Sequence, residues 1–229
     1  MDSKLSDAGR VGVPNRKEAA LSEKNQGAKE RILEAGRKLF FEHGFQRVST
    51  DMIAKEAAVS KTSLYKHFKG LLPLLNAVTR SEAKNFEPGE PLVLTDVQNL
   101  KAALTAYGTR LLSFLNDPEV LQFSQLMQEE ARINKEVAAT FYDAAYGNSL
   151  RFLEDCFSQG LDEGFLNSAL SAGELADQLL GMWEGIPYIR AQMGVTDLPF
   201  PNPAEWSAKC VATLFEAAVN DVSSRSPPQ

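Results

Sequence analysis

The chain has 229 residues, of which 44% are hydrophobic and 24% charged, a composition typical of a folded domain with a sizeable apolar core. No apolar run approaches the ~20 residues that a membrane-spanning helix requires, and the N-terminal sequence lacks the apolar stretch of a signal peptide. The cysteines, Cys156 and Cys210, are far apart and form no CxxC motif, which argues against a disulfide framework or a zinc ribbon. We therefore expect a cytoplasmic protein that folds without disulfides, metal ions or cofactors.

The charge is distributed unevenly along the chain. Residues 1–80 contain 15 Lys and Arg against 9 Asp and Glu, a balance of +6, whereas residues 81–229 contain 9 against 21, a balance of −12. This asymmetry predicts that only the N-terminal part meets a polyanion such as nucleic acid. Chance clustering is the alternative explanation.

Helical spacing of apolar residues dominates, and almost nothing has the alternation of a strand, so the fold class is predicted as all-α. We divide the chain into a flexible basic arm (1–26), a three-helix helix-turn-helix domain (27–71), a larger effector-binding and dimerisation domain (72–222) and a disordered tail (223–229). About nine helices are expected, over residues 28–43, 50–57, 61–68, 72–86, 96–115, 118–133, 135–163, 172–193 and 204–222.

The first three helices form a recognisable unit. Gly44 ends the first helix, and Ser49 is placed to cap the second. Leu64 and Phe68 lie one turn apart on the buried face of the third. Three helices within roughly 40 residues, the last two joined by a tight turn, describe a helix-turn-helix module.

The third helix carries the side chains that could contact DNA. Residues 60–69 read SKTSLYKHFK, rich in hydroxyl and amine groups that donate to phosphate oxygens and base edges. A helix of eight residues is ~12 Å long, which matches the ~12 Å width of the major groove. The same composition also fits an ordinary solvated helix face, so the residue types alone leave both interpretations open.

Residues between Glu30 and Phe68 form a pattern of fixed order and spacing: Leu39-Phe40, Gly44-Phe45, Ile53-Ala54, Val59-Ser60-Lys61, Leu64-Tyr65 and Phe68. In this pattern the chain resembles the TetR family of transcriptional repressors. The segment from Asn116 through Ala131 and the Gly160 to Gly164 end of the long helix show a weaker similarity, to the ligand domain of the AefR-like class.

The resemblance implies a role for each polar residue of the module. Thr50 would contact a phosphate; Lys61, Thr62 and Ser63 would face the bases; Tyr65, Lys66, His67 and Lys69 would hold backbone phosphates. The chain departs from the family in two places. It has Leu71 where a lysine is usual and Ala58 where the turn usually carries glycine, so a phosphate contact would be missing or would move to Lys69, and the turn would be strained or reshaped.

No catalytic constellation is present in the sequence, so we expect no enzyme. His43 and His67 are the only histidines, and neither has a partner three or four residues away that would make a metal site. The chain also lacks the GxSxG, P-loop and GxGxxG motifs.

Aromatic residues in the central long helices predict an apolar ligand pocket. The two tyrosines one turn apart, or a nearby glutamate, would orient the ligand. Aromatic residues at this spacing are also common in an ordinary core, so that alternative stays open. The predicted pocket residues are Phe123, Met127, Glu130, Tyr142, Tyr146 and Trp183.

The last two long helices carry apolar stripes at i+4 spacing that predict a two-fold dimer interface. Gly181 and Gly185 would permit close approach, and Pro187 should kink its helix. The alternative is that both stripes pack inward. The predicted interface residues are Leu175, Leu179, Met182, Ile186, Trp206, Cys210, Leu214 and Ala218.

These observations predict a homodimeric regulator that binds a palindromic double-stranded operator, with no membrane partner. Repression, relieved by a small and mostly apolar effector, is what the family resemblance implies. Two other classes remain as alternatives: an α-helical enzyme or ligand carrier that uses the aromatic cavity, and a helical scaffold whose N-terminal module binds protein.

Overall fold

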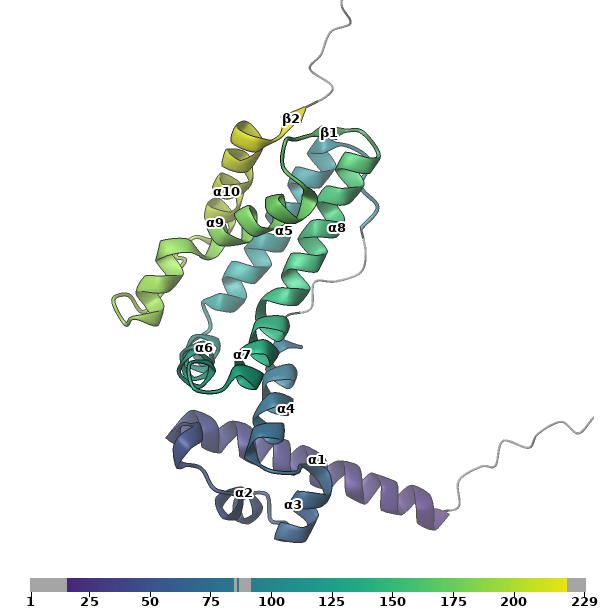
Figure 1. Cartoon of the computed structure of the whole chain (residues 1–229), viewed down its shortest axis with the longest axis vertical. Coiled ribbons are helices and arrows are strands. Elements are labelled where there is room, and N and C mark those ends of the chain that lie inside the picture. The colour runs from purple at the N-terminus through teal and green to yellow at the C-terminus, as the bar shows by residue number, and fades with distance from the viewer. Residues whose placement is uncertain (1–15, 85, 87–91, 222–229) are drawn as a thin grey trace, which may run out of the picture.

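A computed structural model describes residues 16–84, 86 and 92–221 and confirms the all-α fold (Figure 1). The tail 223–229 and the first fifteen residues of the predicted arm lie outside the described residues. Within the described ranges, no helix combines the length and the apolar character needed to cross a membrane. The α-helices are α1 (Arg16–His43), α2 (Thr50–Glu56), α3 (Lys61–His67), α4 (Leu71–Ala83), α5 (Val97–Leu115), α6 (Pro118–Ala131), α7 (Lys135–Tyr142), α8 (Asn148–Asp162), α9 (Ala172–Gln192) and α10 (Pro203–Ala218).

The N-terminal module consists of α1 to α3, with α4 leading away from it toward the rest of the chain (Figure 1). α1 begins at Arg16, so the prediction of an arm through residue 26 is wrong for residues 16–26. The reason is local: this segment reads RKEAALSEKNQ, rich in residues with high helix propensity.

Gly44, Ser49 and Ala58 shape the helix-turn-helix as predicted. Gly44 has a φ of 75° and ends α1, and the Ser49 side chain accepts a hydrogen bond from the Met52 amide at 3.3 Å to cap α2. Ala58, in the turn between α2 and α3, has a φ of 50°. A side chain is disfavoured in this region, so the strain expected at Ala58 is present in the turn.

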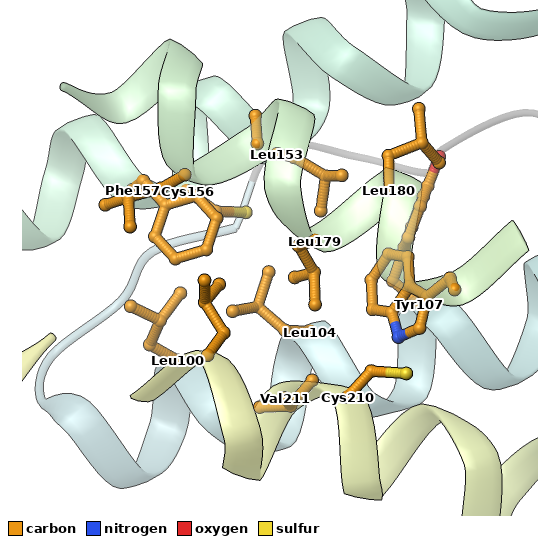
Figure 2. Packing of buried hydrophobic residues seen from close by; sticks show 14 of the residues in the cluster. Leu100, Leu104, Tyr107, Leu153, Cys156, Phe157, Leu179, Leu180, Cys210 and Val211 are labelled. Carbon is orange, nitrogen blue, oxygen red and sulfur yellow. The ribbon is translucent and has the colours of Figure 1, made fainter. Parts of the chain in front are cut away.

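The larger body is a bundle in which α5 packs along α10 and α8 packs along α9. Leucine, phenylalanine and cysteine side chains from these four helices meet in one buried cluster (Figure 2). Burial of such a side chain contributes ~1.5–3 kcal/mol, so this cluster is the main source of stability in the body. Its fully buried members include Leu100, Leu104, Leu112, Leu153, Phe157, Leu175, Leu179 and Trp183.

A kink divides α9, as predicted from Pro187. The break is at Gly185, whose φ of 37° and ψ of −153° are not helical. Because proline has no amide hydrogen, the carbonyl of Trp183 loses its helical partner. The indole Nε1 of Trp206 donates to that carbonyl at 2.9 Å and replaces the missing bond.

The predicted single helix over 135–163 is interrupted by a π-helical turn at Asp143–Gly147, between α7 and α8. If α7, this turn and α8 are counted as one interrupted helix, the described residues contain the expected nine helices. A pair of two-residue strands, β1 (Leu166–Asn167) and β2 (Asn220–Asp221), is antiparallel, with Leu166 opposite Asp221. The last helix, α10, ends at Ala218 just before β2, earlier than the predicted end at residue 222.

A second buried cluster joins the N-terminal module to the body. It contains Ile32 and Phe40 of α1 and Leu74 of α4, and it continues into Phe123 and Met127 of α6. The predicted boundary at residue 71 therefore falls inside one continuous core. Packed side chains therefore connect α4 and α6 directly to the N-terminal module.

Half of the predicted dimer stripe belongs to the interior of the single chain. Leu175 and Leu179 are 0% exposed, and Cys210 and Leu214 are 5% and 2% exposed. These four lie in the core of the bundle, so their assignment to a dimer interface is wrong; the inward-packing alternative holds for them. Met182, Ile186, Trp206 and Ala218 keep accessible surface.

Candidate nucleic-acid interface and ligand cavity

The predicted base-reading end of α3 is open to solvent. Ser60 caps the helix by accepting a hydrogen bond from the Ser63 amide at 3.1 Å, which fixes the first turn. Tyr65 is 50% exposed although it is aromatic, which leaves its hydroxyl accessible. Lys61, Thr62, Tyr65, Lys66 and Lys69 are exposed, and Thr50, Ser63 and His67 are half-buried.

The surroundings of Lys61 and His67 affect how these two side chains can reach DNA. The ammonium of Lys61 forms an ion pair with Asp51 in the first turn of α2. The Nε2 of His67 is buried and has no hydrogen-bond partner. The expected phosphate contact of His67 would thus have to come from its other ring nitrogen, and Lys61 would have to leave Asp51 to reach DNA.

A cavity lies in the body, bounded by the helices α4 to α9 and the π-helical turn. The space inside it that a water molecule can reach is about 80 Å³, below the ~300–1,000 Å³ of typical small-molecule sites, so a larger ligand has to displace lining side chains. π-helical turns are frequent at functional sites, and this one supplies part of the wall. The aromatic lining residues are Phe86, Phe114, Phe123, Phe141, Tyr146 and Tyr188, and the polar ones are Thr79, Glu82, Ser124, Asn148, Ser149 and Glu184.

Of the predicted pocket residues, Phe123 and Tyr146 line this cavity. Trp183 does not: it is 0% exposed, and its Nε1 donates to the Ser207 carbonyl at 3.5 Å inside the bundle. For Trp183 and Met127 the core alternative is correct, since Met127 is also 0% exposed and packs in the cluster shared with the module.

Glu130 and Tyr142 also lie away from the cavity. Glu130 is 4% exposed and accepts a hydrogen bond from Gln46 Nε2 at 2.9 Å, which ties the end of α6 to the turn after α1. Tyr142 is 58% exposed and lines a hollow on the outer side of the wall. That hollow shares Tyr146, Glu184 and Tyr188 with the cavity.

The acidic group of the cavity is Glu184, which the sequence reasoning missed. Burial raises the pKa of its carboxyl to about 7. Burial also raises the pKa of the Tyr188 hydroxyl to about 12, and the nearby Glu184 adds to that shift. The available signal was an acid inside an otherwise apolar stripe, immediately before the Gly185 and Pro187 break.

Glu184 makes the stability of the fold depend on pH. Its carboxyl has a pKa of about 7 in the folded state and an ordinary value near 4.5 when unfolded, so the folded state binds more protons between these values. Stability contributed by the protonated acid is present below about pH 4.5 and is lost as the pH rises toward 7. Glu184→Gln should therefore stabilise the protein by about 1–3 kcal/mol at pH 8 and by much less at pH 4.5. Urea denaturation at the two pH values measures this difference, and equal effects would contradict it.

Two lining residues connect the cavity directly to α1. Phe123 stacks on Phe41 of α1, with ring centroids 5.2 Å apart and planes at 9°. Glu82 accepts a hydrogen bond from Arg37 Nε of α1 at 2.8 Å, and the guanidinium carbon of Arg37 lies 4.7 Å from the centre of the Phe41 ring. The lining of the cavity is therefore in direct contact with α1, the first helix of the N-terminal module.

Sequence comparison identifies both parts of the chain. Residues 32–78 match the family described as bacterial regulatory proteins, tetR family, and residues 102–218 match the C-terminal domain of AefR-like transcriptional repressors. The chain belongs to the TetR family. Proteins of this family regulate transcription through a helix-turn-helix that binds DNA and are not enzymes, and α3 lies within the segment that matches the family.

Individual relatives agree with this placement. The chain is 30% identical over 112 residues to the transcriptional regulator SrpR of Pseudomonas putida, a match that covers 49% of each protein, so it spans about half the length of this relative. Among solved structures, a putative TetR-family regulator from Mesorhizobium loti has a TM-score of 0.70 at 20% identity, covering 85% of this chain and 98% of that one. The flavonoid-responsive regulator FrrA has a TM-score of 0.70 at 22% identity, covering 83% and 96%. These structures share the fold.

Proposed function

We propose that this TetR-family protein is a homodimeric repressor that acts on cytoplasmic DNA and is released from a palindromic operator by a small, mostly apolar effector. The observation that carries the proposal is the double connection between the cavity wall and α1, through Phe123 on Phe41 and Glu82 on Arg37. A ligand that displaces either lining residue changes the position of the DNA-binding module.

The module would read DNA through the N-terminal turn of α3. Lys61, Thr62 and Ser63 would face base edges in the major groove, while Tyr65 and Lys69 would hold phosphates on either side. Because a two-fold dimer presents two such helices, its operator would be a palindrome. Effector binding would favour a conformer whose two modules no longer fit both half-sites.

The outer face of α9 would supply much of the dimer interface. Ile186, Ile189 and Met193 are 57%, 47% and 75% exposed, large values for apolar side chains. Exposed apolar groups clustered on one helix mark a surface that is covered by a partner. Ile186 is the residue of the predicted stripe that belongs to this face.

A mobility-shift assay on the DNA upstream of the protein's own coding sequence tests the proposal. Apolar aromatic compounds that raise the melting temperature should also release that DNA. In Phe41→Leu the compounds should still stabilise the protein, but the concentration that releases DNA should rise ~5–150-fold because the coupling is weakened. Phe45→Leu is the matched control, since Phe45 pairs with Phe40 inside the module at 5.4 Å and does not line the cavity. Compounds that stabilise the protein without ever affecting DNA would contradict the proposal and favour a ligand carrier.

A further inference from the structure

The charges of the cavity wall are all of one sign. Within the described part of the chain, its ionisable lining side chains other than tyrosines are the carboxylates of Glu82 and Glu184, and no lysine, arginine or histidine lines it. Glu82 already has a cation, because Arg37 lies 2.8 Å away on the side of α1. For Glu184, the described residues provide neither an ion pair nor a hydrogen bond. The wall therefore holds one acid without a counter-charge.

Aromatic rings surround this acid. Tyr146 and Tyr188 line both the cavity and the outer hollow together with Glu184, so the carboxylate lies where the two spaces adjoin. The neighbouring walls carry Phe114, Phe123 and further phenylalanine rings. The face of an aromatic ring is electronegative and attracts an organic cation within ~6 Å.

Each class of ligand meets this wall differently. An anionic ligand would be repelled by Glu184, and a neutral ligand without a hydrogen-bond donor would remove water from the carboxylate without replacing its hydrogen bonds, which is costly. A positively charged nitrogen with apolar substituents would pair with the carboxylate and place its substituents against the rings. Tyr107, Tyr146 and Tyr188 face the same acid, and the pKa of each hydroxyl is raised by burial, so none of them competes as an anion at neutral pH.

We infer that the effector of this regulator is an apolar organic cation, such as an aromatic or alkyl ammonium compound, whose nitrogen pairs with Glu184 between Tyr146 and Tyr188. The inference rests on the proposed function and deepens it by naming the chemical class of the ligand and the residue that selects it.

The test uses two ligands of the same shape. Benzyltrimethylammonium carries a quaternary nitrogen, and neopentylbenzene has a carbon atom in its place. At pH 8, where Glu184 is ionised, calorimetry or thermal shift should show the cation binding at least ~10-fold more tightly than the neutral compound. Glu184→Gln should weaken the cation at least ~10-fold and leave the neutral compound unchanged or tighter, while Glu163→Gln, an exposed acid at the end of α8, should change neither.

Two results would overturn the inference. One is equal binding of the two ligands by the wild-type protein; the other is equal loss of both in Glu184→Gln, with DNA binding without ligand retained as proof of folding. In either case, release of DNA by neopentylbenzene would still support the proposed function. Stabilisation by the cation without any release of DNA would instead support the cation site and contradict the proposed function.

Discussion

Raising the salt concentration from 50 to 200 mM should weaken binding of the protein to its operator by ~10³–10⁵-fold. The physical reason is counterion release: each phosphate neutralised by a lysine or arginine frees a condensed cation, and a dimer is expected to make roughly 6–10 such contacts. Lys61, Lys66 and Lys69 are exposed on or next to α3, which gives three candidate contacts in each subunit. Fluorescence anisotropy with a labelled operator measures the slope. A flat dependence would contradict the assignment of these lysines to phosphates.

The ion pair between Lys61 and Asp51 provides a second test of the role of Lys61 in DNA binding. Because Lys61 must leave Asp51 to contact DNA, the carboxylate opposes binding both by holding the lysine and by repelling phosphate. Asp51→Asn should tighten binding several-fold on every DNA sequence. Glu205→Gln breaks a comparable exposed pair, with Lys209 at 2.6 Å in α10, and should leave DNA binding unchanged. If both variants behave alike, the pair at α3 has no part in recognition.

The helix-turn-helix was predictable because its signals are local. Gly44 and the capping serines Ser49 and Ser60 each act within one turn of the chain, and the predicted ends of α2 and α3 agree with the structure to within one residue. Helix propensity also explains why α1 extends back to Arg16. The helix-forming residues before Ala28 therefore belong to α1, where a flexible arm was predicted.

The lining of the cavity was predicted only in part, because spacing identifies a buried face but not what that face contacts. Trp183 and Glu184 are neighbours on α9, yet the indole packs in the bundle and the carboxylate lines the cavity. The π-helical turn adds a further change that periodicity cannot supply, since one extra residue rotates everything after it by ~100°. Tyr146, within this turn, faces the cavity, whereas Tyr142, before it, faces outward.

The prediction of the dimer interface was partly wrong for the same reason. Leu175, Leu179, Cys210 and Leu214 repeat at helical spacing because they face α5 and α8 of their own chain. An apolar stripe toward a core and one toward a partner have the same period, so the sequence left both possibilities open. Exposure separates them: Ile186 is 57% exposed and Leu179 is 0% exposed, although both lie on α9.

Replacing Trp183 by alanine should destabilise the fold by ~3–5 kcal/mol, because it empties a fully buried aromatic site in the centre of the bundle.

The indole of Trp183 also explains why a glycine, Gly108, lies in the middle of α5. A Cβ added at Gly108 would lie 2.4 Å from Trp183 Cε2 and 2.4 Å from Ser207 Oγ, much closer than atoms pack. Gly108→Ala should therefore cost ~1–3 kcal/mol even though alanine favours helices.

The two substitutions should not be additive, since each changes the space that the other needs. In the Trp183→Ala background, Gly108→Ala should cost at least ~1 kcal/mol less than it does alone, because the indole that it would meet is gone and the new methyl group partly fills the cavity. Gly27→Ala is the matched control: an added Cβ there has Arg31 Nη1 as its nearest neighbour at 3.8 Å, an ordinary contact, and the residue lies inside α1. It should stabilise the protein by ~0.5–1 kcal/mol through helix propensity. Urea denaturation of the four variants tests this prediction: if Gly108→Ala is as harmless as Gly27→Ala, the close packing of α5 against Trp183 is not a constraint on this fold.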